Sequence, residues 1–238
     1  MSVPAVWCIV VAGGSGRRFG GAKQWMELAG ERVVDRSVAT AAAACDGVVV
    51  VVPASDLDGA EIPGATAVVA GGASRSASVR AGLARVPAEA DVVLVHDAAR
   101  PLAGVDLFER VVAAVRDGAD VAIPVVAVTD TIRHVDGGVV DRDELRAVQT
   151  PQGFAAPMLR AVHLDEPDAT DDAGLVEAAG GTVTLVEGET TNLKLTDRHD
   201  LVVAEALLAA RPAPTAGSAS PSAAGAGSPG DELSARLT

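Results

Sequence analysis

The chain has 238 residues and a formal net charge of −13 at pH 7; 49% of its residues are hydrophobic and 2% are aromatic. Because an acidic surface repels polyphosphates, we expect no nucleic-acid partner, although a local cluster of cations could still hold a small anion. No apolar run approaches the roughly 20 residues of a membrane span, and no basic segment of a signal peptide precedes the first apolar run. These features predict a cytoplasmic protein without a membrane partner.

Short valine-rich runs alternate with segments of helical length over the first half of the chain. We expect strands at residues 6–12, 48–53, 66–70, 91–96 and 121–126, and helices at residues 32–45, 74–86 and 105–117. The apolar runs are continuous, which is typical of strands covered on both faces. Strand–helix alternation implies right-handed crossovers in a parallel sheet. The predicted fold is therefore α/β, a Rossmann-like, mostly parallel sheet flanked by helices.

The pattern changes after Val126. Polar alternation around Asp136-Gly137-Gly138 indicates a β-hairpin, which we expect to protrude as an arm over about residues 127–150. Helices are predicted at residues 157–164, 171–179 and 197–210, with a strand at residues 182–187. From Arg211 onward Pro, Ala, Gly and Ser dominate, a composition that cannot bury enough apolar surface to fold. We therefore predict one domain over residues 1–210 and a disordered tail over residues 211–238.

A glycine-rich loop, VVAGGSGRRFGGAKQW, follows the first predicted strand. Backbone N–H groups in such loops commonly bind phosphate. A dinucleotide fingerprint would need glycine in place of Phe19 and an acidic residue near Val52-Pro53. A P-loop would need Gly-Lys-Ser/Thr, where the chain has Ala22-Lys23-Gln24. An NAD-binding Rossmann oxidoreductase thus remains only a distant alternative.

The lysine in this loop is unusual for the chain. Lys23 and Lys194 are the two lysines among 19 basic residues. The loop pattern A-G-G-x-G-x-R, followed by lysine, resembles the signature of the sugar-phosphate nucleotidyltransferases. When a phosphate attacks the α-phosphorus of a nucleoside triphosphate, charge must be held on the non-bridging oxygens and the leaving pyrophosphate. A compact ammonium can lie between phosphates where a guanidinium would not fit, so we expect Arg18 and Lys23 to stabilise this transition state.

Further motifs follow in chain order and narrow the resemblance. They are GGASRSASVRAGL (71–83), VHDAARP (95–101), DT (130–131) with DR (141–142), AVQTPQGF (147–154), ATDDA (169–173) and TTNLKLT (190–196). With the glycine loop, this set resembles the 2-C-methyl-D-erythritol 4-phosphate cytidylyltransferase family. The resemblance implies that the phosphate of methylerythritol phosphate attacks CTP and releases pyrophosphate, in the non-mevalonate isoprenoid pathway. We expect no covalent intermediate, because no suitable nucleophile lies among the motifs.

The resemblance also implies a role for each site residue. The catalytic residues would be Arg18, Lys23 and Lys194. The nucleotide-binding residues would be Ala12, Gly13, Gly14, Gly16, Gly72, Ser78 and Ala98. The substrate-binding residues would be Asp97, Arg100, Thr131, Arg142, Thr150, Thr170 and Asp171.

Two of these roles carry a further implication. Asp97 follows a predicted strand, and a carboxylate there suits Mg²⁺, which usually takes one or two protein carboxylates together with phosphate oxygens. Thr131 and Arg142 lie on the predicted arm, where the resemblance implies that they reach the methylerythritol phosphate of a neighbouring subunit. The expected assembly is a homodimer formed through the arm.

The chain departs from the family pattern at Ala22, Ala73 and Arg146, where proline, a polar residue and tryptophan are usual. The histidines show no metal-ligand spacing and are predicted to be structural or solvated. The acidic stretch 165–172 is predicted to be mostly solvated surface, apart from Thr170 and Asp171.

Two alternatives stay open besides the oxidoreductase. A ribitol 5-phosphate cytidylyltransferase shares most of these motifs and differs in the polyol. A catalytically silent nucleotide-binding regulator would not need the cations and the carboxylate that the motifs retain.

Overall fold

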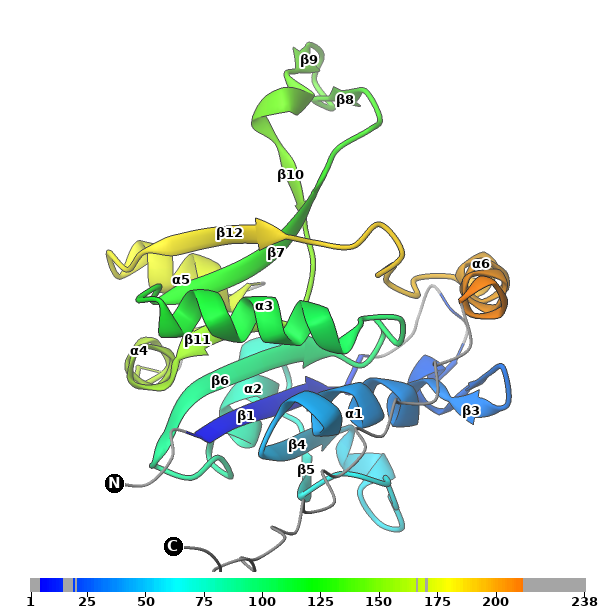
Figure 1. The fold of residues 1–238 in the computed structure, drawn as a ribbon, viewed down its shortest axis with the longest axis vertical. Coiled ribbons are helices and arrows are strands. Elements are labelled where there is room, and N and C mark those ends of the chain that lie inside the picture. The colour runs from blue at the N-terminus through cyan, green and yellow to red at the C-terminus, as the bar shows by residue number, and fades with distance from the viewer. Residues whose placement is uncertain (1–4, 15–18, 20, 166, 170, 212–238) are drawn as a thin grey trace, which may run out of the picture.

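The computed structural model describes residues 5–14, 19, 21–165, 167–169 and 171–211. Its central feature is one twisted sheet with helices on both faces, from which a hairpin arm projects (Figure 1). The sheet strands are β1 (Ala5–Val11), β4 (Gly47–Val52), β5 (Ala67–Ala70), β6 (Ala90–Asp97), β7 (Val121–Ala127), β10 (Arg146–Val148), β11 (Gln152–Ala155) and β12 (Val183–Glu187).

The strand order places β1 at a change of direction in the chain path. Hydrogen bonds link β10, β7, β11, β6, β1, β4 and β5 in that order, and β12 pairs with β7. From β1 the chain runs outward through β4 and β5, then returns to lay β6 on the other side of β1. Ligands of open α/β sheets bind at such a switch point, outside the carboxyl ends of the strands.

The sheet is mostly parallel, as predicted, but it contains two antiparallel strands. The β10 and β11 segments are antiparallel to β7, and β11 is also antiparallel to β6. The sequence pattern did not indicate β11. Its four residues include Gly153, where an added Cβ would lie 2.5 Å from a Val111 side-chain carbon. Close packing of a helix over the strand therefore requires a residue that weakens the strand signal.

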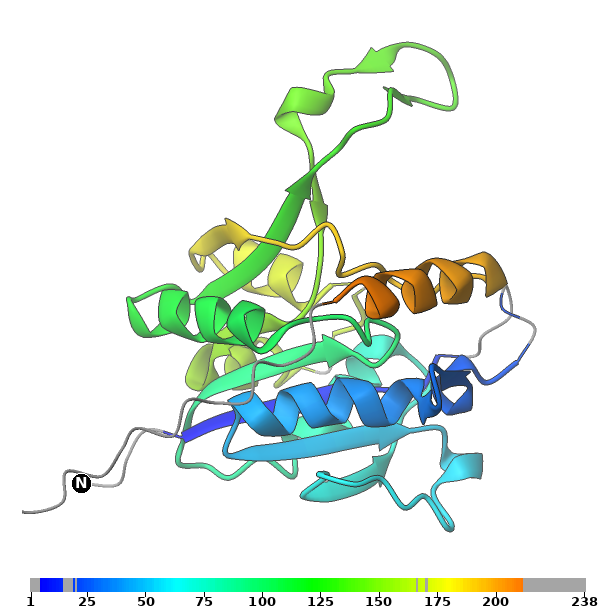
Figure 2. The same ribbon diagram turned by 45° about the vertical axis from the view of Figure 1, so that its right-hand side comes forward.

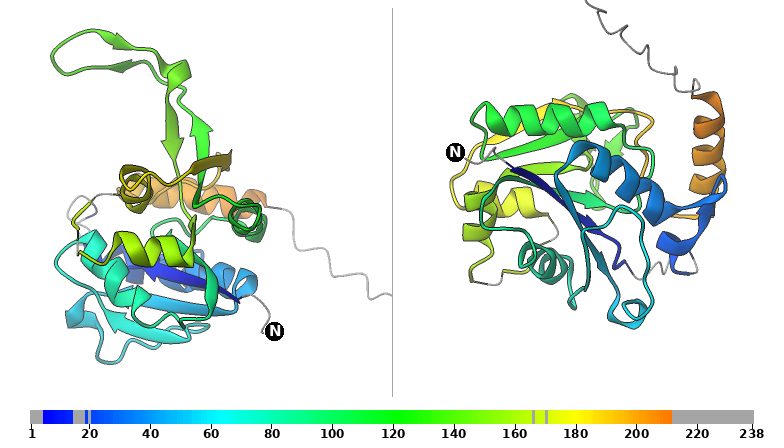
Figure 3. Two further views of the ribbon diagram at one scale, coloured as in Figure 1. Left: turned by 90° about the vertical axis from the view of Figure 1, so that its left-hand side faces the viewer. Right: turned by 60° about the horizontal axis from the view of Figure 1, so that its bottom comes forward.

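Helices cover both faces of the sheet (Figure 3). The longer ones are α1 (Val33–Ala44), α2 (Arg75–Leu83), α3 (Val105–Arg116), α4 (Ala156–Val162), α5 (Asp172–Ala178) and α6 (Arg198–Ala210), with 3-10 turns η1 (Lys23–Trp25), η2 (Ala54–Asp56) and η3 (Arg142–Glu144). One apolar cluster joins α1 and α3 to the sheet, and a second joins α2, α4 and α5 to the opposite face. The fully buried strand β4 contributes to both clusters.

The last helix packs beside the small hairpin formed by β2 (Glu27–Leu28) and β3 (Glu31–Arg32) (Figure 2). Ala204 of α6 belongs to an apolar cluster with Leu28, Leu102 and Leu195. This cluster anchors the chain on either side of Lys23 and Lys194, so the backbone positions of both lysines are fixed.

The arm continues β7 and β10 beyond the sheet. It ends in the short antiparallel pair β8 (Ile132–Arg133) and β9 (Val139–Val140), joined by a turn in which Gly137 and Gly138 have positive φ angles of 109° and 84°. The glycine pair therefore forms the hairpin turn that the sequence indicated. Val135 in this turn is fully exposed.

The predicted helices and strands are all present, with bounds that differ by a few residues at most. The largest shift is in α2, which ends at Leu83 because the following residues form a turn closed by hydrogen bonds from Arg85 and Val86. In the part of the chain that the structure describes, no helix is long and apolar enough to cross a membrane.

Candidate active site

A cavity of about 440 Å³ opens at the carboxyl ends of β1 and β6, at the switch point of the sheet. Its lining comes from the loop after β1, from η1, from the start of α2, from the turn after β6 and from the segment before α6. These lining residues are Val11, Ala12, Gly13, Gly14, Lys23, Gln24, Gly72, Ala73, Ser74, Arg75, Ser78, Asp97, Ala98, Ala99 and Lys194.

Among the described residues, the charged lining residues are three cations and one carboxylate. Lys23 Nζ donates a hydrogen bond to the Leu195 carbonyl oxygen at 2.7 Å, and Lys194 Nζ donates to Asp97 Oδ2 at 2.6 Å. Lys23 is thus tied to the residue beside Lys194, although the two lysines lie near opposite ends of the folded domain in sequence. A chain with a net charge of −13 therefore carries a local positive cluster in this cavity, which suits an anionic ligand.

Asp97 is ionised in this setting. Burial opposes the ionisation of Asp97, but the charges of Lys194 and Arg75 and the hydrogen bond from Lys194 outweigh it, so the pKa of Asp97 lies below its usual value. The cavity thus holds a fixed negative charge beside its cations.

The start of α2 forms another part of the cavity wall. The Gly72 N–H donates to Ser78 Oγ at 3.2 Å, and the Ser78 hydroxyl donates to the Ser74 carbonyl at 2.9 Å. An added Cβ on Gly72 would lie 2.4 Å from Ala77 Cβ, so the tight turn requires glycine. Ser76, in contrast, is fully buried and points away from the cavity, where it bonds the Ala169 backbone.

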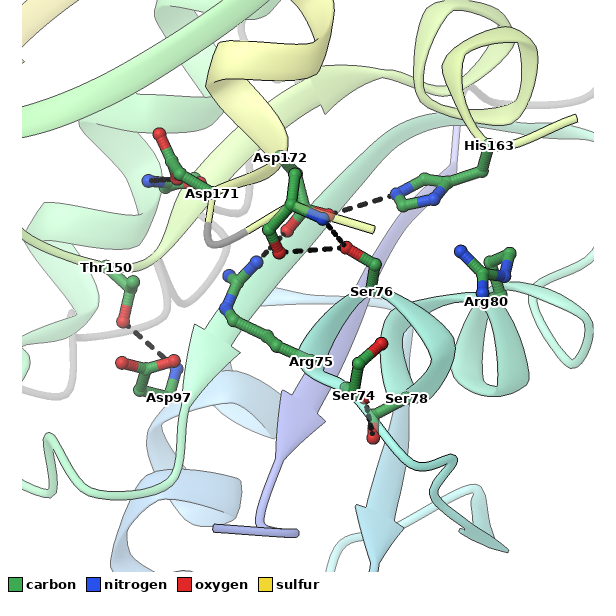
Figure 4. A network of polar contacts seen from close by, with 12 residues as sticks. Ser74, Arg75, Ser76, Ser78, Arg80, Asp97, Thr150, His163, Asp171 and Asp172 are labelled. Carbon is green, nitrogen blue, oxygen red and sulfur yellow. Dashed lines mark hydrogen bonds and ion pairs between the residues drawn. The ribbon is translucent and has the colours of Figure 1, made fainter. Parts of the chain in front are cut away.

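Thr150 supports the Asp97 backbone. Its Oγ1 accepts a hydrogen bond from the Asp97 N–H at 3.0 Å (Figure 4). The same oxygen lies 3.1 Å from His96 Nδ1. Burial lowers the pKa of His96 to about 4, so the ring is neutral at pH 7 and we assign its Nδ1 as acceptor of the Thr150 hydroxyl. The histidines were predicted to be structural or solvated, and His96 is structural, because its side chain is fully buried.

Arg100 lies next to this group and is held by backbone oxygens. Its guanidinium donates to the carbonyls of Asn192 at 2.7 Å and of Val148 at 3.1 Å. The buried Asn192 side chain donates in turn to the Thr150 carbonyl at 3.0 Å. The TTNLKLT motif therefore supplies Lys194 to the cavity and fixes Arg100 through its backbone.

The adjacent carboxylates Asp171 and Asp172 have different environments. Asp171 Oδ1 accepts a hydrogen bond from Gln152 Nε2 at 2.7 Å, so its carboxylate is oriented by β11. Asp172 is fully buried, forms an ion pair with Arg75 and lies within hydrogen-bond distance of His163. The prediction of a mostly solvated acidic surface over residues 165–172 is wrong for Asp172, because two cationic or donor groups from other elements compensate its burial.

Two further predicted residues, Thr131 and Arg142, do not line this cavity. Thr131 and Arg142 lie on the arm, where both line a shallow surface depression and Arg142 donates to the Thr129 carbonyl at 2.6 Å. Gly16, Arg18 and Thr170 lie outside the described residues.

A divalent cation could be held here only with help from a ligand. Over the described ranges, no group of three or more His, Cys, Asp or Glu side chains could hold a metal ion. The single carboxylate of Asp97, facing a cavity that suits phosphates, fits the habit of Mg²⁺ to take one or two carboxylates and fill its shell with phosphate oxygens and water.

Sequence reasoning missed Arg75 and Gln152. Arg75 directly follows the predicted N-terminus of a helix beside a glycine pair, a position that could have marked it as a ligand-facing cation. Gln152 gave no signal, because its partner lies 19 residues away and is brought near only by the insertion of β11 into the sheet.

Comparison with known proteins agrees with this geometry. The family described as "IspD: 2-C-methyl-D-erythritol 4-phosphate cytidylyltransferase" matches residues 6–210. The 2-C-methyl-D-erythritol 4-phosphate cytidylyltransferase of Rhodococcus jostii strain RHA1 is 46% identical over 215 residues, covering 85% of this chain and 95% of the relative. The corresponding protein of Frankia casuarinae is 45% identical over 218 residues, covering 87% and 82%.

Comparison with solved structures indicates the same family. The crystal structure of the 2-C-methyl-D-erythritol 4-phosphate cytidylyltransferase from Thermus thermophilus superposes with a TM-score of 0.73 at 38% identity, covering 86% of this chain and 98% of that one. The chain belongs to the IspD family, the 2-C-methyl-D-erythritol 4-phosphate cytidylyltransferases.

Proposed function

We propose that this chain transfers the cytidylyl group of CTP to the phosphate of 2-C-methyl-D-erythritol 4-phosphate. The products are 4-diphosphocytidyl-2-C-methyl-D-erythritol and pyrophosphate. A phosphate oxygen of the polyol attacks the α-phosphorus of CTP, the bond from that phosphorus to the β-phosphate oxygen breaks, and pyrophosphate takes the electron pair. This activity follows from family membership.

The observation that carries the proposal is the convergence of the two lysines. Lys23 and Lys194 are far apart in a chain that otherwise uses arginine, yet both line one cavity together with Asp97. Ammonium groups can lie between phosphate oxygens as point charges. The two substrates are both polyanions, so fixed cations lower the repulsion that opposes their approach and stabilise the charge that develops in the transition state.

Each wall of the cavity has a proposed ligand. The glycine loop, with Gly13 and Gly14 after β1, would hold the triphosphate with Arg18 and Lys23. The turn at Gly72 and Ser78 would bind the cytosine, and Ala98 would lie by the ribose. Arg100, Thr150, Thr170 and Asp171 would lie on the side of the polyol phosphate.

Mg²⁺ would be held by Asp97 together with phosphate oxygens of CTP. When bound, it supplies positive charge to the phosphates. The chain itself keeps Asp97 ionised through Lys194 and fixes its backbone through Thr150.

A homodimer would complete the site. The arm carries Ile132, Val135 and Val139 as exposed apolar side chains, which a monomer would leave in water. A second chain packed against the arm would cover them and would bring Thr131 and Arg142 to the partner's polyol phosphate.

Pyrophosphate release measured with CTP and each of two polyol phosphates tests the function. We expect turnover with 2-C-methyl-D-erythritol 4-phosphate to exceed turnover with D-ribitol 5-phosphate by roughly 100-fold or more in kcat/KM, which corresponds to about 2.7 kcal/mol. A preference for ribitol 5-phosphate would establish the alternative, and no turnover with either would refute the proposal.

A further inference from the structure

Helix α2 carries a second set of polar contacts beside the nucleotide wall. Ser76 Oγ donates to the Ala169 carbonyl and accepts from the Ala169 N–H, both at 3.0 Å, and Arg80 donates to the Pro167 carbonyl at 2.7 Å. Arg75, the first residue of the helix, pairs with Asp172 (Figure 4). These contacts fasten the helix to the segment that leads into α5.

Asp172 is the centre of this set. One carboxylate oxygen accepts from Arg75, and the other lies 3.0 Å from His163 Nε2 on the residue that ends α4. Burial opposes the ionisation of Asp172, but the hydrogen bond from His163 and the charge of Arg75 outweigh it, so its pKa lies below the usual value. The carboxylate is therefore charged at neutral pH although its side chain has no exposed surface.

Such a pair fixes geometry more than it adds stability. The cost of removing two charges from water largely offsets their attraction, and apolar side chains of similar volume often stabilise a core equally well. What the pair does supply is a single direction for a long side chain that would otherwise sample many rotamers.

That direction leads into the cavity. Arg75 lines it and keeps a quarter of its side-chain surface exposed, while its partner Asp172 is out of contact with solvent. The charge of Arg75 contributes to the lowered pKa of Asp97, so the guanidinium acts on the cavity and on the buried carboxylate together. Gly72 and Ser78 stand on either side of it in the sequence, within the same wall.

We propose that Asp172, backed by His163, is a positioning residue for the nucleotide wall. It holds the Arg75 guanidinium against the cavity, and with it the first turn of α2, so that the wall is already in place before CTP arrives. This inference rests on the proposed function, because the ligand of the wall is taken to be CTP.

The test compares Asp172→Asn, Arg75→Gln and the double variant in the full chain. We expect the dissociation constant of CTP, measured by calorimetry without polyol phosphate, and the KM for CTP each to rise about tenfold in both single variants, with kcat within about threefold. Because Asp172 acts through Arg75, the double variant should bind CTP no more weakly than Arg75→Gln alone.

A matched control is Asp91→Asn. Asp91 forms the Arg116 ion pair at 3.5 Å near the start of β6, at the end of that strand away from Asp97. The Asp91→Asn variant should bind CTP with a dissociation constant within twofold of wild type. If circular dichroism shows that Asp172→Asn does not fold, Asp172→Glu takes its place, because it keeps the negative charge and displaces it by one methylene. The same tenfold rise in the dissociation constant and KM for CTP is expected.

Independent, multiplicative effects of the two substitutions would overturn the positioning role, and so would CTP binding within twofold of wild type in the folded single variants. The proposed function fails separately: a wild-type chain that binds CTP but does not convert methylerythritol phosphate would refute that function and leave the binding test intact.

Discussion

At the scale of single residues, we expect the proposed reaction to depend most on Lys23. It lies in the cavity on η1 and donates to the Leu195 carbonyl, so its position is fixed from the far end of the chain. Lys23→Ala should lower kcat by roughly 100- to 1,000-fold, because a cation aimed at developing charge is lost. Steady-state pyrophosphate release measures this.

The control for Lys23→Ala is a measurement of its thermal stability. The thermal midpoint of Lys23→Ala should remain within a few degrees of wild type, since a half-buried lysine contributes little to the core. Lys23→Arg should recover little of the activity, because a planar guanidinium does not replace a compact ammonium. A kcat within threefold of wild type in the alanine variant would refute the assigned role.

His96 makes stability depend on pH. Its pKa is lowered from 6.5 to about 4 by burial in the fold, so the unfolded chain binds a proton at a higher pH than the folded chain does. The free energy of unfolding therefore falls as pH decreases from about 6.5 toward 4. Between pH 7 and pH 5 this one group should remove about 2 kcal/mol.

Urea unfolding of wild type and of His96→Asn at both pH values measures this contribution. The amide oxygen of asparagine can still accept from the Thr150 hydroxyl, and the variant should lack this part of the pH dependence. Equal losses between pH 7 and pH 5 in the two proteins would contradict the assignment of a neutral, buried His96.

The sequence allowed prediction of those residues whose types are rare or whose spacing is local. Lys23 was predicted from its rarity within a glycine-rich loop and Asp97 from its place after a strand, whereas Lys194 followed from the family resemblance; the structure brings all three to one cavity. Arg75 and Asp172 could not be predicted as a pair, because their contact joins two helices that are 97 residues apart in the chain. An acidic residue in an acidic stretch gives no sign that it will be buried.

At the scale of elements, β11 is a strand of the central sheet that the pattern did not predict. Parallel strands show themselves as continuous valine runs, whereas QGFA is short and contains glycine. Its place between β6 and β7 depends on long-range pairing. Long-range pairing is what local propensity cannot report.

Gly153 in β11 offers a test of that packing. An added Cβ would lie 2.5 Å from Val111 and 3.0 Å from Leu94, so Gly153→Ala should cost about 1–3 kcal/mol of unfolding free energy through overpacking. Gly174→Ala is the matched control. It lies exposed in α5 with open space around the added Cβ, and should stabilise slightly because alanine favours helix.

Chemical denaturation of both glycine variants measures these changes in unfolding free energy. A Gly153→Ala protein as stable as wild type would show that α3 does not pack against β11 as closely as described.

At the scale of the whole molecule, the proposed homodimer would build each site from two chains through the arm. If Thr131 and Arg142 act in the partner's site, a variant lacking Lys23 and a variant lacking Arg142 should complement each other. Mixed dimers would contain one site with both residues intact. Random exchange of subunits makes half of the dimers mixed, so Lys23→Ala mixed with Arg142→Ala should regain about a quarter of wild-type activity.

Each variant assayed alone is the control for complementation and should remain nearly inactive. Activity of the mixture that never exceeds the sum of the two separate variants would contradict an arm that acts across the dimer. A solution mass of one chain for wild type would contradict the dimer itself.

The overall architecture was predictable because it repeats one local rule. A valine run followed by an amphipathic segment gives a strand and its crossover helix. The arm was predictable from its Asp-Gly-Gly turn. The location of the cavity depends on how the chain returns from β5 to β6 beside β1, which only the assembled sheet reveals.

In the proposed reaction, the polyol phosphate itself attacks the α-phosphorus of CTP. Turnover with 2-C-methyl-D-erythritol 4-phosphate carrying ¹⁸O in its phosphate tests this most directly, with phosphorus NMR and mass spectrometry of both products. Direct attack predicts that every label remains in 4-diphosphocytidyl-2-C-methyl-D-erythritol, one of them able to occupy the bridge between the two phosphorus atoms, and that pyrophosphate carries none. Label in the pyrophosphate, or no diphosphate product at all, would contradict the account.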